Sequence, residues 1–276
     1  PPKLVPPRLD WDRPPWTRWS FQHVRAILPT AEIWRGYGPV RALPRADADL
    51  DNLSVADAAG TSIPLMGFLD ETYTDGFLVL KNGGISYERY FNGMDHRTLH
   101  LSQSMSKSFV GMTAGILASG GLLDVNAPVT AYLPELEQTG WRGATLQQVL
   151  DMTTGTRFSE DYVNPYSDVG QMDVASDWKP VPPDSDASFK WPRHMWELIT
   201  GLTETVRGHG DLFAYRSVET DVLAFCLERV TGKRLPQLLS EEIWQKMGAE
   251  ESSCITVDSA GYALASGGLN ATLRDY

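Results

Sequence analysis

The sequence has few cysteines, no excess of positive charge and no long uninterrupted hydrophobic run. Its only cysteines are Cys226 and Cys254, which cannot form a disulfide framework, so we expect a protein of the reducing cytoplasm. Acidic residues outnumber basic ones, 35 to 24, and the net charge of -11 argues against nucleic acid or an anionic membrane as a partner. The longest apolar stretch, residues 109–123, contains four glycines and is too short to span a bilayer comfortably.

The composition is that of a globular protein, and several elements can be predicted. Of the 276 residues, 42% are hydrophobic and 21% charged, which is enough for one large or two small domains. Two β-rich runs flank Asn82-Gly83 within residues 77–91 and predict a hairpin. Further predictions are helices at 104–119, 129–133, 145–152, 193–202, 218–231 and 235–247, a strand at 254–257, and a long loop at 156–193.

The sequence Ser104-Met-Ser-Lys107 opens the predicted helix at 104–119. Residues three apart share one face of a helix, so the hydroxyl of Ser104 is expected beside the amine of Lys107. A lysine among apolar neighbours loses its proton more easily and can then activate a serine without a histidine. The alternative is structural, with Ser102 or Ser104 as a helix cap and Lys107 in solvent.

Two other patterns in the sequence suggest chemistry but have simpler explanations. Ser176 and Lys179 repeat the same spacing, but Pro180 follows the lysine and disfavours a helix there, so we interpret this pair as chance. His96 and His100 would share a helix face and could bind zinc, but no third ligand is evident. We therefore expect neither a metal ion nor an organic cofactor.

Three motifs in this order resemble a known family. They are Ser104-Met-Ser-Lys107, Tyr215-Arg-Ser217 before a helix, and the segment Ser266-Gly-Gly-Leu-Asn-Ala-Thr-Leu-Arg-Asp275. Together they resemble the serine hydrolases that include class C β-lactamases, penicillin-binding proteins and related esterases. Segments such as 71–80, 149–152, 160–163, 220–224 and 228–232 are similar to the 6-aminohexanoate-dimer hydrolase (nylon oligomer hydrolase) branch of that family.

The resemblance implies a role for each matching residue. Ser104 would be the acylated nucleophile, Lys107 its general base and Tyr215 the phenol that relays a proton to the leaving group. Ser217 stands where many relatives carry asparagine, which weakens a β-lactam interpretation, and we assign Ser217 and Ser266 to substrate binding. The backbone N–H of Ser104 would be one oxyanion donor.

The resemblance also implies an α+β, β-lactamase/transpeptidase-like fold. It predicts an antiparallel sheet flanked by helices and an all-helical region, with the family's C-terminal strands, second oxyanion donor and terminal helix absent from this chain. We expect an N-terminal extended arm (1–70), an α/β region with the hairpin and central helix (71–123 and 236–276), and a mainly helical region with the substrate loop (124–235).

The expected function is that of a serine hydrolase acting on small linear amides or esters, similar to 6-aminohexanoate oligomers. In the resemblance, Tyr162 matches a tyrosine that approaches the substrate amide, and Asp173 lies where a carboxylate could hold a terminal ammonium or simply be solvated. A general carboxylesterase, a D-amino-acid peptidase or β-lactamase-like enzyme, and an inert binding relative are the alternatives. The expected partner is a small molecule, and the sequence leaves a homodimer open.

Overall fold

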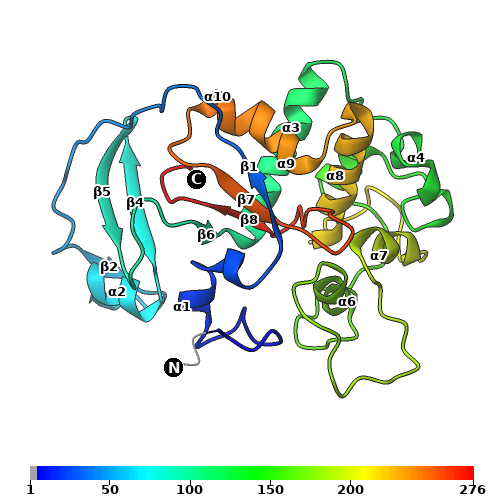
Figure 1. Ribbon diagram of the computed structural model, residues 1–276, viewed down its shortest axis with the longest axis horizontal. Coiled ribbons are helices and arrows are strands. Elements are labelled where there is room, and N and C mark those ends of the chain that lie inside the picture. The colour runs from blue at the N-terminus through cyan, green and yellow to red at the C-terminus, as the bar shows by residue number, and fades with distance from the viewer. Residues whose placement is uncertain (1–4) are drawn as a thin grey trace.

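A four-stranded antiparallel sheet lies at the centre of the molecule (Figure 1). The computed structural model describes residues 5–276. The strand order is β1-β7-β8-β6, and β8 pairs with β7 on one side and β6 on the other. The strands are β1 (Thr30–Ile33), β7 (Ser253–Thr256), β8 (Leu269–Ala271) and β6 (His100–Leu101).

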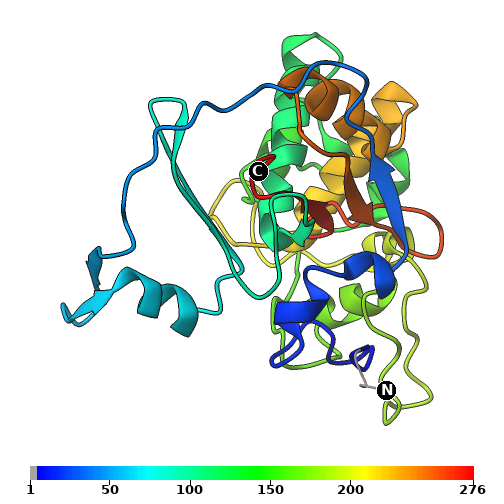
Figure 2. The ribbon, with the colours of Figure 1, turned by 60° about the vertical axis from the view of Figure 1, so that its left-hand side comes forward.

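Two hairpins stand beside this sheet and do not pair with it. The larger joins β4 (Gly76–Lys81) to β5 (Gly84–Tyr90), and the smaller joins β2 (Ser54–Ala56) to β3 (Ser62–Pro64). Asn82 and Gly83 both have positive φ, 52° and 78°, as the two-residue turn requires, which confirms the predicted hairpin. Figure 2 shows this hairpin held away from the body of the molecule.

Helices cover the central sheet and form most of the hydrophobic core. The central helix α3 (Ser106–Ser119) packs against α8 (Ser217–Thr231), and both contribute to the larger apolar cluster. Left-handed glycines, Gly121 and Gly232, follow these two helices as predicted. The other helices are α1 (Thr17–Ser20), η1 (Val24–Ala26), α2 (Leu65–Glu71), η2 (Gln103–Met105), α4 (Val129–Tyr132), η3 (Pro134–Gln138), α5 (Leu146–Leu150), α6 (Asp168–Ala175), α7 (Met195–Gly201), α9 (Leu235–Leu239), η4 (Ser240–Trp244) and α10 (Gln245–Met247). Among residues 5–276, none of these helices has the length and apolar character needed to cross a bilayer.

Two predictions of local structure were wrong, and a third was confirmed with a local irregularity. The predicted loop at 156–193 contains α6, whose first turn is capped by the hydroxyl of Ser167 accepting from the N–H of Gly170. The helix predicted at 235–247 is confirmed over its whole length, as α9, η4 and α10 in unbroken succession, with a π-helical turn at Ser240–Trp244. The helix predicted from Ser104 begins at Ser106, and Ser104 lies in the preceding 3-10 turn.

The N-terminal residues take part in the body of the fold. Strand β1 forms one edge of the central sheet, with Thr30 opposite Thr256. Nearer the N-terminus, Trp11 is fully buried and its indole N–H donates to the carbonyl of Trp178 over 2.8 Å. This segment therefore covers the loop that was assigned to the substrate, a contact that the sequence did not predict.

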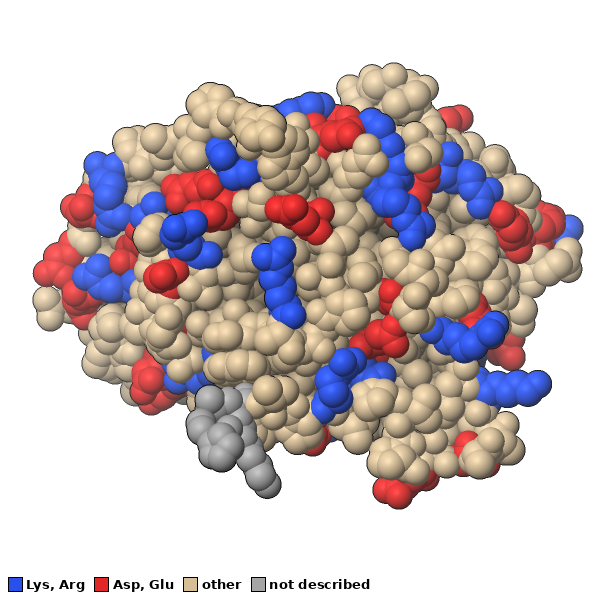
Figure 3. Space-filling model, viewed as in Figure 1, with Lys and Arg blue, Asp and Glu red and all other residues tan. Residues whose placement is uncertain are grey.

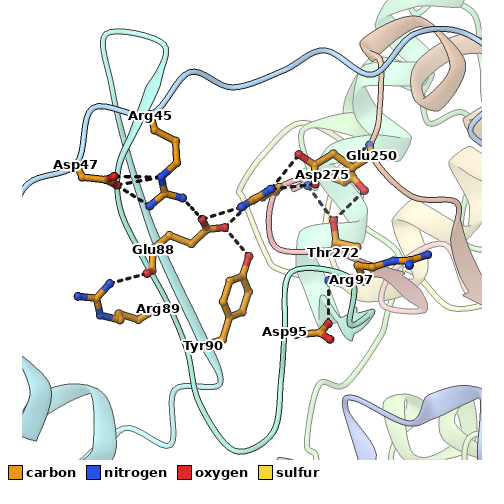
Figure 4. A network of polar contacts seen from close by, with 11 residues as sticks. Arg45, Asp47, Glu88, Arg89, Tyr90, Asp95, Arg97, Glu250, Thr272 and Asp275 are labelled. Atoms are coloured by element: carbon orange, nitrogen blue, oxygen red, sulfur yellow. Dashed lines mark hydrogen bonds and ion pairs between the residues drawn. The ribbon is translucent and has the colours of Figure 1, made fainter.

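An ionic network joins the larger hairpin to the body of the molecule (Figure 4). Glu88 of β5 is 8% exposed and accepts hydrogen bonds from Arg274 (2.6 and 2.9 Å), Arg45 (2.5 Å) and Tyr90 (2.6 Å). Arg274 also pairs with Glu250 at 3.2 Å. Burial alone would raise the pKa of Glu88, but these donors outweigh it and lower that pKa to about 2.

The network predicts that acid weakens the attachment of the hairpin. Because the folded-state pKa of Glu88 is depressed, its contribution is present above the ordinary value of 4.5 and is lost as the pH falls toward about 2. We expect this carboxylate to contribute about 1 to 3 kcal/mol, since partly exposed Arg45 is screened by solvent. Urea unfolding at pH 7 and pH 3 checks this, with Glu88→Gln as the reference that lacks the titrating group. If the free energy of unfolding falls by the same amount from pH 7 to pH 3 in the parent and in Glu88→Gln, the stabilising role of the ionised Glu88 would be contradicted.

Candidate active site

Three side chains from two segments meet at Ser104. The Nζ of Lys107 lies 3.1 Å from the Oγ of Ser104, and the hydroxyl of Tyr215 donates to the same oxygen over 2.6 Å. The Nζ of Lys107 also lies 5.0 Å from the centre of the Tyr215 ring. The structure thus brings the serine, the amine and the phenol named from the sequence into one cluster, with Ser104 and Tyr215 exposed and Lys107 half-buried.

The turn that presents Ser104 is fixed by its serine neighbours. Gln103 has a φ of 51°, a left-handed conformation that is unusual for a non-glycine residue and turns the chain just before Ser104. The hydroxyl of Ser106 donates to the carbonyl of Gln103 over 2.8 Å and accepts from the N–H of Leu269 in β8 over 3.0 Å. The N–H of Ser102 donates to the carbonyl of Leu269 over 2.9 Å. Ser104 therefore sits on a turn anchored to the central sheet.

Lys107 makes a second contact besides the one with Ser104. Its ammonium donates to the carbonyl of Ser266 over 2.7 Å. The backbone at this point is in turn held by Asp221 of α8, whose Oδ1 accepts from the N–H of Ala265 over 2.8 Å and of Ser266 over 3.4 Å. Sequence reasoning missed Asp221, although it lies six residues after Tyr215 at the start of a helix.

A small cavity of about 70 Å³ opens beside Ser104 and contains the residues assigned to the substrate. Its lining includes Ser104, Tyr162, Asp173, Ser217 and Ser266, together with Gln103, Val169, Met172, Ser176, Trp178, Leu264 and Gly267. All four proposed substrate-binding residues thus border the same space as the nucleophile, and their roles remain predictions.

Glu160 links two of these residues and was not assigned a role from the sequence. Its carboxylate accepts from the hydroxyl of Tyr162 and from the backbone N–H of Ser217, at the first turn of α8. Burial and the hydrogen bond to Glu160 raise the pKa of Tyr162, so its phenol stays protonated at neutral pH. A carboxylate at a helix N-terminus is favoured by the helix dipole, which explains its place here.

Asp173 is partly neutralised within the protein itself. The Nζ of Lys179 lies 2.9 Å from Oδ2 of Asp173 and 2.9 Å from Oδ2 of Asp12 in the N-terminal segment. The amine of Lys179 thus binds two carboxylates rather than Ser176, whose hydroxyl donates to the carbonyl of Asp173 over 3.3 Å. Burial raises the pKa of Asp173, and the neighbouring Lys179 opposes this shift.

The histidines do not share a helix face. His96 lies in a turn and His100 in β6, where its Nε2 is 3.2 Å from Oδ2 of Asp75. His100 borders a cavity of about 460 Å³ between α1, β4 and β6, which is larger than the one beside Ser104. Size does not decide the site here, because the hydroxyl, amine and phenol needed for nucleophilic chemistry converge at the smaller cavity.

The fold and this cluster define a class of protein. The family model described as Beta-lactamase matches residues 69–276, and the chain belongs to this family, with its β-lactamase/transpeptidase-like fold. It is 38% identical over 273 residues to the 6-aminohexanoate-dimer hydrolase of Paenarthrobacter ureafaciens, a match that covers 98% of this chain and 65% of that relative's length. A Bacillus anthracis structure, assigned provisionally as a 6-aminohexanoate-dimer hydrolase, matches with a TM-score of 0.91 and 30% identity over 100% of this chain and 70% of its own.

More distant structures share the fold only. The octameric penicillin-binding protein homologue of Pyrococcus abyssi has a TM-score of 0.56 and 17% identity, over 76% of this chain and 52% of its own. The family assignment confirms the resemblance seen in the sequence. The family model covers residues 69–276, which are 208 of the 276 residues.

Proposed function

We propose that this protein is a serine hydrolase that cleaves small linear amides or esters, similar to 6-aminohexanoate oligomers, through an acyl-enzyme on Ser104. The observation that carries the proposal is the pair of contacts at the Oγ of Ser104, from Lys107 at 3.1 Å and Tyr215 at 2.6 Å. A hydroxyl held between an amine and a phenol has both a proton acceptor and a proton relay within reach. The likeness to the Paenarthrobacter hydrolase supports the choice of substrate class.

The proposed reaction has two steps. The Oγ of Ser104 attacks the substrate carbonyl while its proton passes to the free amine of Lys107. The Tyr215 hydroxyl then gives its proton to the leaving nitrogen or oxygen and regains one from Lys107, and the carbon–heteroatom bond breaks to leave the acyl-enzyme. Water, deprotonated by the same pair, attacks the ester carbonyl and releases the acid and Ser104.

The proposed partner is a small molecule. The cavity beside Ser104 is small, and Trp178, Leu264 and Met172 contribute apolar surface to its lining. On the face drawn in Figure 3, lysine and arginine side chains are interspersed with aspartate and glutamate. This mixture and the net charge of -11 support a neutral or cationic small substrate over a polyanion.

The proposal is tested by the products and by the labelled residue. Purified protein is incubated with a linear 6-aminohexanoate dimer, a short-chain ester and a penicillin, and separately with a serine-directed phosphonate probe. We expect hydrolysis of the dimer or the ester ahead of the penicillin, and a single phosphonate adduct on the peptide that contains Ser104. Ester hydrolysis alone would favour a general carboxylesterase. An adduct on another residue, or none with all three substrates intact, would overturn the proposal.

A further prediction concerns the charge next to Asp173. Lys179→Met removes the ammonium that competes for this carboxylate, so the KM for an amino-terminated amide should fall by about tenfold while the KM for a neutral ester stays unchanged. Lys190→Met is the matched control, because Lys190 is exposed and borders a different cavity. Parallel changes for both substrates would show that Asp173 does not contact a substrate ammonium.

A further inference from the structure

Asp221 is a buried carboxylate that the proposed reaction does not use. It lies on α8, which packs against the helix that carries Lys107, and it is 1% exposed. Within the described residues its Oδ2 has no hydrogen-bond partner. A buried carboxylate with an unpaired oxygen is costly and calls for an explanation, because replacing it with an apolar residue would ordinarily be favourable.

A short chain of contacts connects Asp221 to the nucleophile. Oδ1 of Asp221 accepts from the N–H of Ala265 over 2.8 Å and from the N–H of Ser266 over 3.4 Å. The carbonyl of the same Ser266 accepts from Lys107 over 2.7 Å, and Lys107 reaches Ser104 at 3.1 Å. Fixing the N–H groups of residues 265 and 266 therefore also fixes the carbonyl that orients the amine.

Several charged groups lie on the elements around Asp221, and they differ in whether they act on its carboxylate. Burial raises the pKa of Asp221 to about 7, and it outweighs the hydrogen bond with the Ser266 side chain and the attraction of Lys107 on α3, both of which lower that pKa. On the same helix, Glu219 accepts from Trp141 and Thr154 and pairs with Arg216. Tyr215, which precedes this helix, donates to Ser104. The 265–267 segment contributes no charged side chain. Lys107 is thus the cation on which a charge at position 221 acts.

We propose that Asp221 is a positioning residue for Lys107, which holds the backbone of residues 265 and 266 against the amine and favours its protonated form. The inference rests on the proposed function, because it assumes that Lys107 activates Ser104. Its chemical consequence is that Asp221 sets the pH at which the amine becomes free to take the proton of Ser104.

The test measures the rate of phosphonate labelling of Ser104 between pH 5 and 10, which needs no knowledge of the substrate. Asp221→Asn keeps an oxygen that can accept from the N–H of Ala265 but removes the charge. An ammonium without a nearby anion loses its proton more readily, so the midpoint of the rise in rate should move lower by about 0.5 to 1 pH unit. The rate above that midpoint should change by less than about threefold, because the hydrogen bond remains.

Two further variants separate charge from packing. Glu219→Gln removes a carboxylate that is 0% exposed from the same helix, and its partners are Trp141, Thr154 and Arg216 rather than the contacts to Lys107, so it should leave the midpoint unchanged. Asp221→Ala removes the charge and the acceptor, so its midpoint should move in the same direction while its limiting rate falls about tenfold. Thermal unfolding shows which variants are folded. The labelling midpoint of either folded variant at position 221 is enough to test the role of Asp221.

The outcomes distinguish this inference from the proposed function. A folded Asp221→Asn or Asp221→Ala protein with the parental midpoint would overturn the positioning role while leaving the nucleophile in place. Equal shifts in Asp221→Asn and Glu219→Gln would also overturn it, because they would indicate a general effect of buried charge. A parent protein that is not labelled at any pH would overturn the proposed function, and this inference with it.

Discussion

Replacing Ser104 with alanine is expected to abolish both hydrolysis and phosphonate labelling. The change removes the only oxygen that is in contact with both Lys107 and Tyr215 among the described residues, at 3.1 and 2.6 Å. Without a nucleophile no acyl-enzyme forms, and kcat/KM should fall by on the order of 10⁴-fold or more. Intact-protein mass spectrometry checks the result directly, since the parent gains one adduct and the variant none.

The matched control for this change is Ser108→Ala. Ser108 is an exposed serine in α3, about one turn after Ser104, and it is not among the residues that border the cavity at Ser104. Its variant should keep parental activity and labelling. Because Ser104 is itself exposed, Ser104→Ala should unfold at the parental temperature. Residual labelling of a folded Ser104→Ala protein would mean that another residue is the nucleophile.

Replacing Lys107 with methionine should have the second largest effect. Methionine has a similar length and shape but cannot accept the proton of Ser104 or donate to the carbonyl of Ser266. Loss of a general base costs typically 10²- to 10⁴-fold, and we expect a fall in kcat of about 10³-fold with a smaller change in KM. The rate of acylation, measured by single-turnover labelling, should fall in parallel.

Lys107→Arg separates proton transfer from charge. An arginine keeps a positive charge and hydrogen-bond donors at this position, but its guanidinium does not give up a proton in a protein. If the amine acts as a base, the arginine variant should be nearly as inactive as the methionine variant. Recovery of activity in the arginine variant would show that the role of Lys107 is electrostatic, and the proposed mechanism would then be wrong.

Local sequence predicted those parts of the site that lie close together in the chain. Ser104 and Lys107 are three residues apart, so one helical turn is enough to place them side by side, even though Ser104 lies in a 3-10 turn rather than the α-helix. The hairpin at Asn82-Gly83 and the glycine at the end of α8 were predictable for the same reason, because turn chemistry depends on one or two residues. Tyr215 was identified only through its likeness to a family motif.

The remaining features depend on contacts between distant segments, which no local pattern encodes. The short helix α6, strand β1 and the π-helical turn within 235–247 were not evident from local propensity, because short elements depend on packing for their stability. Asp12 reaches Lys179 across 167 positions of sequence, and Asp221 reaches the backbone of Ala265 across 44. The sequence alone therefore determined the family and pointed to Ser104 and Lys107 as the proposed nucleophile and its amine. The tertiary structure decided which buried carboxylates surround them, because burial and pairing exist only once the chain has folded.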